Sequence, residues 1–156
     1  MSRVLIVDDD PSIRRLLTTL AKREGIQADS AADGGEAIAL LRTHTYALVL
    51  LDLMMPRVNG FAVIEWLSKN PPSRKPVVFV ISAYADHMYR SVDTSIVAGV
   101  LHKPFDVADV GSLLRHVTRG WNDDLVAALR NSRERAIREF IEAENRERTS
   151  PETPQH

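Results

Sequence analysis

The chain has 156 residues, of which 44% are hydrophobic and 26% charged, with a formal net charge of -1. This is the composition of a soluble globular protein, and the balanced charge does not favour nucleic acid or a membrane surface as a partner. Because cysteine is absent, disulfides, thiolate metal sites and cysteine nucleophiles are excluded. The chain shows neither a signal peptide nor an apolar run of about 20 residues, so we expect a cytoplasmic protein.

The first half of the chain alternates short apolar runs with segments of helical periodicity. Asp10 and Pro11 are typical of a helix start, and Gly25 suits the end of that helix. Its expected apolar face consists of Ile13, Leu16, Leu17, Leu20 and Ala21. In chain order we expect a strand at 4–7, a helix from 11 to 25, a weak strand at 26–32, a helix at 36–42 and a doubly apolar strand within 46–55.

The second half continues the alternation. Pro71 and Pro72 end a helix, and Asp106 is expected to cap the last helix of this region. The expected elements are a helix from 61, a strand at 76–83, a helix at 86–97, a short strand at 99–105 and a helix with Val110, Leu113, Leu114 and Val117 on one face. Strands that alternate with helices predict an α/β protein with a doubly wound parallel sheet covered on both faces.

Polar residues stand where the expected strands end. Asp8 and Asp9 follow the first strand, Asp52 the third, Ser82 the fourth and Lys103 the fifth. Because ligands bind at the carboxyl ends of the strands in such sheets, we expect these residues to form one pocket. Clustered carboxylates with no cysteine suit a hard cation such as Mg²⁺, with Mn²⁺ as an alternative. An aspartate in this setting can act as a nucleophile and form an aspartyl-phosphate.

Four segments in this order resemble the receiver domain of two-component response regulators: VLIVDDDPSIRR, LVLLDLMMPRVNG, VVFVISA and VLHKPF. The resemblance covers roughly residues 2–119. It implies a flavodoxin-like fold with five strands in the order 2-1-3-4-5, and a cis peptide bond between Lys103 and Pro104.

The resemblance also implies a role for each site residue. Asp52 matches the phospho-acceptor, and Lys103 matches the lysine that contacts the phosphoryl group. Ser82 matches the switch hydroxyl. Asp8 and Asp9 match the acidic pair that binds Mg²⁺, with Asp9 the more direct ligand, and Met54 would contribute only its backbone carbonyl.

The implied activity is that of a phosphorelay protein. The donor would be a histidine kinase or a histidine phosphotransfer protein, and the chain would catalyse its own phosphorylation and slow autodephosphorylation. Two alternatives remain: a receiver fragment of a larger regulator, and a pseudo-receiver or FMN-binding module that works without phosphorylation. Acids and a lysine at the strand ends disfavour FMN, whose phosphate prefers a neutral, hydroxyl-rich loop.

The sequence departs from the family pattern at several positions. Val100 stands where the family usually has an aromatic residue that moves on phosphorylation, and Ile96-Val97 replaces the usual Gly-Ala. These changes leave the expected phosphorylation chemistry intact and concern how the signal is passed on. The resemblance also implies that Met54 and Tyr84 occupy the two positions that influence hydrolysis of the phosphoryl group in the family, and neither is suited to orient a water molecule.

The expected organisation is a receiver domain at 1–120, a charged helix at 121–148 and a disordered tail at 149–156. In the helix, pairs such as Glu134 and Arg138 are four residues apart and contribute about 0.2–0.5 kcal/mol each. The residues after 120 are not basic, so DNA binding is not expected. The apolar stripe of the helix at 121–148 fits three alternatives: a helix that is solvated or folds back on the domain, a helix that forms a homodimer or docks on an unknown target, and a linker to an output domain.

If the apolar stripe of 121–148 is a dimer interface, deletion of the residues after Trp121 should convert a dimer into a monomer. Sedimentation equilibrium measures this change directly. A full-length chain that is monomeric both with and without a phosphoryl analogue would contradict the dimer hypothesis.

Overall fold

The computed structural model describes residues 3–83, 93, 95–119, 142 and 145–146. Its strands are β1 (Arg3–Val7), β2 (Gln27–Ala31), β3 (Leu48–Asp52), β4 (Val77–Ser82) and β5 (Val97–His102). Its helices are α1 (Pro11–Arg23), α2 (Gly34–Thr43), α3 (Gly60–Lys69) and α5 (Val107–Arg119). Within these ranges we find no helix that is long and apolar enough to cross a membrane.

The five strands form one parallel sheet in the order β2-β1-β3-β4-β5. This confirms the doubly wound, flavodoxin-like fold predicted from the sequence. The chain first builds outward from β1 to β2 and then returns to place β3 on the other side of β1. Strand order therefore reverses between β1 and β3, and a crevice is expected at their carboxyl ends.

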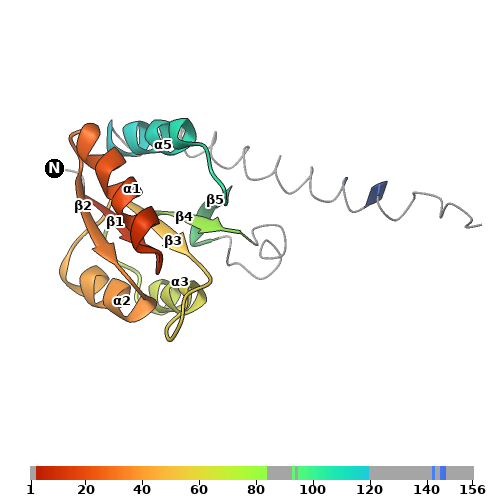
Figure 1. Ribbon diagram of the computed structural model, residues 1–156. Helices are drawn as coiled ribbons and strands as arrows, with labels where there is room; N and C mark the ends of the chain where they lie inside the picture. The colour runs from red at the N-terminus through yellow and green to blue at the C-terminus, as the bar shows by residue number, and fades with distance from the viewer. Residues whose placement is uncertain (1–2, 84–92, 94, 120–141, 143–144, 147–156) are drawn as a thin grey trace, which may run out of the picture.

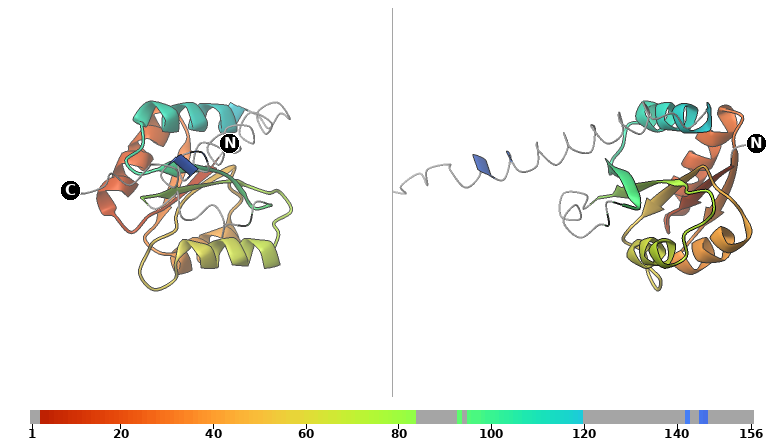
Figure 2. Two further views of the ribbon diagram at one scale, coloured as in Figure 1. Left: turned by 90° about the vertical axis from the view of Figure 1, so that its right-hand side faces the viewer. Right: turned by 180° about the vertical axis from the view of Figure 1, so that it is seen from behind.

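Helices cover both faces of the sheet (Figures 1 and 2). Helices α1 and α5 pack on one face, with Leu17 and Leu114 in a shared apolar core. Helices α2 and α3 pack on the other face, where Ala37 and Val63 belong to a second core. Strands β3 and β4 are buried along their whole length between the two layers, which explains why their sequences are apolar without alternation.

Polar side chains fix the start of three helices. Asp10, Asp33 and Asn59 each accept a hydrogen bond from a backbone N–H in the first turn of α1, α2 and α3, respectively. The predicted cap at Asp10 with Pro11 following it is confirmed. Helix α2 begins two residues before the predicted start at Glu36, because its cap is Asp33.

The predicted helix at 86–97 falls mostly outside the described residues, and its predicted end is wrong. Val97 is the first residue of β5, where it pairs with Val78. The register then shifts, so that Phe79 pairs with Gly99. A Cβ atom on Gly99 would lie 2.5 Å from the Phe79 ring, so a larger residue at this position would require the ring to shift. This irregularity hides the true start of the strand from a reading of the sequence.

Leu16 was predicted on the buried face of α1, and this prediction is wrong. Its side chain is 40% exposed, whereas Leu17, Leu20 and Ala21 are buried. The stripe of α1 that faces the sheet is narrower than the hydrophobic pattern suggests, so the edge residue reaches solvent.

The loops that flank the carboxyl ends have two notable backbone features. The peptide bond between Lys103 and Pro104 is cis, as the family resemblance implied. Arg57, between β3 and α3, has a φ angle of 66°, in the left-handed region that suits glycine. Its guanidinium lies 4.0 Å from Asp33 and is 84% exposed, so this ion pair contributes little.

Replacement of Arg57 by Gly should therefore raise the free energy of unfolding by up to about 1 kcal/mol. The left-handed penalty of about 1–2 kcal/mol is relieved, while glycine costs about 0.4–1 kcal/mol through the unfolded chain. Urea denaturation measures the difference. Arg57→Ala is the matched control, since it removes the same guanidinium but keeps the Cβ atom, and it should not stabilise. Equal stabilisation by both variants would contradict the backbone explanation.

Candidate functional site

The polar residues predicted to converge do meet at the carboxyl edge of the sheet. Asp8 directly follows β1, Asp52 is the last residue of β3, and Lys103 directly follows β5. Ser82 is the last residue of β4, one position beyond the residue that pairs with Asp52. Because all five strands run in parallel, their ends bring these side chains to one edge.

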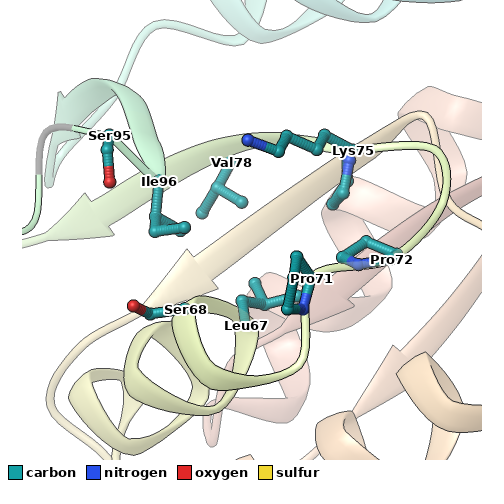
Figure 3. A pocket seen from close by; sticks show the side chains of 9 residues that line it. Leu67, Ser68, Pro71, Pro72, Lys75, Val78, Ser95 and Ile96 are labelled. Carbon is teal, nitrogen blue, oxygen red and sulfur yellow. The ribbon is translucent and has the colours of Figure 1, made fainter.

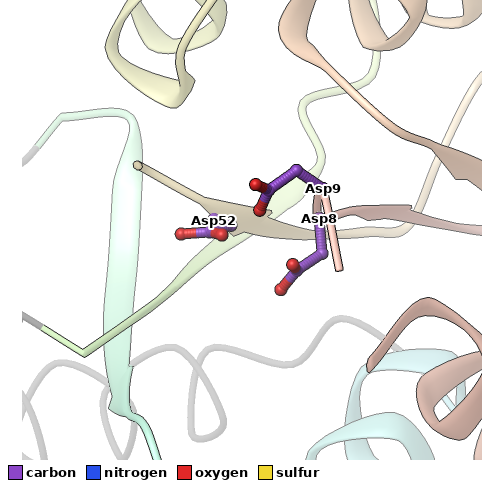
Figure 4. A group of neighbouring side chains, drawn as sticks. All are labelled: Asp8, Asp9 and Asp52. Carbon is purple, nitrogen blue, oxygen red and sulfur yellow. The ribbon is translucent and has the colours of Figure 1, made fainter. Parts of the chain in front are cut away.

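Three carboxylates form a cluster at this edge (Figure 4). Asp8, Asp9 and Asp52 each present an oxygen, and these oxygens lie within 4.8 Å of one another. Asp8 is 1% exposed and Asp52 4% exposed, whereas Asp9 lies at the surface. The cluster therefore has two buried members and one member at the surface, where an ion can approach from solvent.

Lys103 connects two members of the cluster. Its Nζ atom donates hydrogen bonds to Oδ2 of Asp8 at 2.8 Å and to Oδ2 of Asp52 at 3.3 Å. The lysine side chain is 19% exposed, so its charge is only weakly screened by solvent. One ammonium group thus neutralises part of the negative charge that these two buried carboxylates bring together.

The buried charges perturb one another. Burial, together with the negative charge of Asp8, raises the pKa of Asp52 from 3.8 to about 6, although Lys103 opposes the change. Burial alone would lower the pKa of Lys103, but its hydrogen bond to Asp8 and the charges of Asp52 and Asp8 outweigh burial and raise it. Asp52 therefore remains mostly ionised near pH 7, at an energetic cost.

Backbone and side-chain donors orient both buried acids. The N–H of Asp10 donates to Oδ1 of Asp8 at 2.9 Å, and the N–H of Met54 donates to Oδ1 of Asp52 at 3.1 Å. Arg14, on the first turns of α1, donates from Nη1 to the Asp8 carbonyl at 2.7 Å. Arg14 was not singled out in the sequence, because its position relative to the site depends on how α1 packs.

The donor set fits a hard divalent cation. All three clustered groups are carboxylates, which are the ligands Mg²⁺ and Mn²⁺ prefer. Asp8 and Asp52 are both buried and share the single ammonium group of Lys103, so two buried carboxylates face one positive charge. The oxygen-only donor set and this excess of negative charge are together the chemical conditions that favour such an ion.

The remaining predicted residues take different positions. Ser82 is 1% exposed, and its carbonyl accepts a hydrogen bond from the Lys103 N–H at 2.9 Å. Met54 has a 52% exposed side chain beside the site. Val100 pairs with Val80 and packs, half-buried, against the α2–α3 core. Tyr84 lies outside the described residues.

A pocket of about 260 Å³ opens elsewhere on the molecule (Figure 3). Residues from the end of α3, the loop before β4 and the start of β4 line it, including Leu67, Pro71, Lys75 and Val78. The pocket lies beside the amino end of β4, whereas the acidic cluster lies at the carboxyl edge of the sheet. The pocket is therefore separate from the residues with candidate chemistry.

Comparison with known proteins identifies a family. Residues 4–115 match the model of the response regulator receiver domain. The chain is 35% identical over 118 residues to the probable transcriptional regulator ycf27 of Porphyridium aerugineum, a match that covers 75% of this chain and 48% of the relative. It is 40% identical over 81 residues to protein PilH of Pseudomonas aeruginosa, covering 51% of this chain and 67% of PilH. The chain thus spans about half the length of the transcriptional regulators it matches.

Solved structures agree with this comparison. The response regulator protein TrrA of Thermotoga maritima, in complex with Mg(2+)-BeF, superposes with a TM-score of 0.66 and 28% identity, over 75% of this chain and 99% of TrrA. The receiver domain of the Francisella response regulator 1452 superposes with a TM-score of 0.67 and 26% identity, over 76% of this chain and 98% of that domain.

Because the pKa of Asp52 is raised, the contribution of this residue to the stability of the metal-free protein falls as pH rises. Between about pH 4 and pH 6 the folded state binds more protons at Asp52 than the unfolded state, so this contribution to the free energy of unfolding falls and then levels off. Asp52→Asn removes this dependence and should stabilise the protein at pH 7.5 by about 1–3 kcal/mol. Urea denaturation in EDTA at pH 4.5 and 7.5 measures both effects.

Asp9→Asn is the control for this prediction, because Asp9 lies at the surface and should matter much less. A variant Asp52→Asn that is no more stable than the parent protein at pH 7.5 would contradict the assigned cost of the buried charge.

Proposed function

The chain belongs to the response regulator receiver family of two-component systems, and on this basis we propose that it accepts a phosphoryl group on Asp52. The donor is a phosphohistidine on a histidine kinase or a histidine phosphotransfer protein. The phosphorylated chain then acts through contacts with a further protein. This proposal extends the family membership to particular residues and to a particular output.

The hydrogen bonds from Lys103 to both Asp8 and Asp52 are the observation that carries the proposal. They place an ammonium group beside a buried carboxylate whose Oδ1 is held by the Met54 N–H. A structural aspartate needs only charge compensation, whereas this one belongs to a cluster that also includes the surface residue Asp9. This arrangement supports group transfer at Asp52.

In the proposed reaction an oxygen of Asp52 attacks the phosphorus of the donor. The new O–P bond forms as the P–N bond of the donor breaks. The electron pair of the P–N bond leaves with the imidazole. Asp52 reacts in its ionised form, which predominates above its pKa of about 6. Lys103, already within 3.3 Å of Asp52, neutralises charge on the phosphoryl oxygens during transfer.

We assign the metal site to Asp8, Asp9 and Asp52 together with the backbone carbonyl of Met54. When bound there, Mg²⁺ supplies positive charge that offsets the negative charge of the phosphoryl oxygens. The spacing of the three carboxylates, and the single ammonium group that the two buried ones share, support the assignment. Mn²⁺, with similar ligand preferences, should substitute.

Ser82 is proposed as the hydroxyl that contacts the phosphoryl group after transfer. It is the last residue of β4, next to the strand that ends in Asp52, and its backbone carbonyl accepts a hydrogen bond from the Lys103 N–H. Val100 is neither polar nor aromatic, so it cannot make the movement that the family's usual aromatic residue makes on phosphorylation. The signal should therefore pass this position differently from the usual family pattern. We keep 1–120 as the receiver domain.

The segment 121–148 is proposed as a helix that forms a homodimer or docks on the target. Of that segment only Glu142, Asn145 and Arg146 are described, and each is helical and exposed. The segment 149–156 remains an expected tail and falls outside the described residues.

A second candidate function is that of the receiver part of a longer transcriptional regulator. The observation in its favour is that the chain spans about half the length of such relatives. The length of the natural reading frame distinguishes the two. A phosphorylation-independent scaffold is distinguished by the experiment that follows.

Acetyl phosphate with Mg²⁺ should add one phosphoryl group to the protein, and mass spectrometry of the intact chain measures it. Asp52→Asn should abolish the addition, because the nucleophilic oxygen is lost, and EDTA should suppress it. The adduct should be labile, as an acyl phosphate is.

Asp10→Asn is the matched control, since asparagine caps a helix as well as aspartate does and Asp10 lies beside the site without a proposed role in it. It should be labelled like the parent protein. Undiminished labelling of Asp52→Asn would rule out Asp52 as the acceptor, and no labelling of the parent protein would favour the scaffold.

A further inference from the structure

The loop at 53–59 joins the candidate site to the helix layer that consists of α2 and α3. It follows Asp52 directly, contains Met54, and ends at the start of α3. The proposed metal ligand from this loop is a backbone carbonyl, which has no rotamers of its own. Its position is therefore fixed only by the path of the loop, and the contacts that fix this path determine the geometry of the site.

The near contact of the loop lies on α3. The Gly60 N–H donates to the Leu53 carbonyl at 3.1 Å. A Cβ atom on Gly60 would lie 2.4 Å from the Asp52 carbonyl oxygen and 2.8 Å from Cα of Leu53. The first turn of α3 thus packs directly on the backbone that leads out of β3.

The far contact lies on α2, distant in sequence from the site. The Gly34 N–H donates to the Val58 carbonyl at 2.8 Å. A Cβ atom on Gly34 would lie 2.7 Å from that oxygen, 2.7 Å from Cγ1 of Val58 and 2.9 Å from the Asn59 carbonyl. Two of these three atoms are backbone atoms, so a larger residue at 34 requires the loop or α2 to move.

Helix α2 is the more rigid partner in this contact. Asp33 caps it by accepting from the Glu36 N–H at 2.9 Å, and the Glu36 carboxylate accepts from the Ala32 N–H at 2.8 Å. Ala37, one turn further, is fully buried in the core. The loop has a surface-exposed side chain at Val58 and a left-handed residue at Arg57, so displacement falls on the loop.

We propose that Gly34 is a positioning residue for the metal site: through its contact with Val58 and Asn59 it sets the path of the loop and the position of the Met54 carbonyl. The inference rests on the proposed Mg²⁺ site and extends it to a residue of α2 that touches neither the metal nor the phosphoryl group. Helix α2 and the site are therefore coupled, and the coupling is reciprocal.

Gly34→Ala tests the proposal, and Gly35→Ala is its matched control. Both variants add one methyl group to the first turn of α2 and gain similar helix propensity. Gly35, however, is exposed, and its Cβ atom would meet only the Asp33 Oδ1 at 3.2 Å and Cγ2 of Val58 at 3.9 Å. The pair differs chiefly in contact with the backbone of the loop.

Mg²⁺ titration by calorimetry and thermal unfolding in EDTA and in Mg²⁺ give two independent readouts. Gly34→Ala should weaken Mg²⁺ affinity by about tenfold or more, the usual effect of disturbing the supports of a metal ligand. The increase in unfolding temperature caused by Mg²⁺ should shrink accordingly. Gly35→Ala should bind Mg²⁺ like the parent protein.

If Gly34→Ala binds Mg²⁺ as tightly as the parent protein does, this inference alone is overturned. The same holds if the unfolding temperature of Gly34→Ala falls equally in EDTA and in Mg²⁺ while its Mg²⁺ affinity stays unchanged. Absence of Mg²⁺ binding by the parent protein would overturn the proposed site and this inference together. Should Gly34→Ala fail to fold, Val58→Gly tests from the loop side whether the path of the loop sets the affinity, because it loosens the loop backbone and keeps the hydrogen bond from Gly34. It should weaken Mg²⁺ binding by loosening the loop, and unchanged affinity would overturn the inference.

Discussion

The burial of carboxylates at the end of a parallel sheet is the constraint on which this structure depends. Asp8 and Asp52 are almost fully buried, and a buried like-charged pair is stable only beside a positive charge. Lys103 supplies one such charge and must reach across the sheet to do so. The doubly wound order makes this reach feasible, because β1 and β3 are neighbours and their ends meet where strand order reverses. The fold and the site are thus two results of one arrangement.

A carboxylate in the middle of β2, that of Asp29, has different surroundings from those of Asp52. Asp29 on β2 accepts hydrogen bonds from Arg3 at 2.8 Å and from the Tyr46 hydroxyl at 2.7 Å. Burial would raise the pKa of Asp29, but these two hydrogen bonds outweigh it and the pKa is lowered. At Asp52 burial and Asp8 prevail, and the pKa is raised. The ionised form of an aspartate is therefore stabilised on β2 and disfavoured at the end of β3.

Sequence reasoning located the polar residues that directly end or follow an apolar run. Asp8, Asp52, Ser82 and Lys103 could be predicted because each ends or follows a strand, and parallel strands bring their ends together. It could not supply contacts set by the packing of separate elements. The bond from Arg14 to the Asp8 carbonyl and the approach of Gly34 to Val58 both depend on how a helix lies against a loop. The Asn59-Gly60 pair reads as an ordinary turn, yet Gly60 packs against the backbone of Asp52.

Lys103 also has a mechanical consequence. Strand β5 forms one edge of the sheet, and among the described strands its only partner is β4. The lysine that follows it spans β4 and reaches carboxylates at the ends of β3 and β1. The ion pairs of Lys103 thus connect the edge strand β5 to the ends of the inner strands β1 and β3. Lys103 therefore links the charge around Asp52 to β5, and α5 begins only five residues after His102.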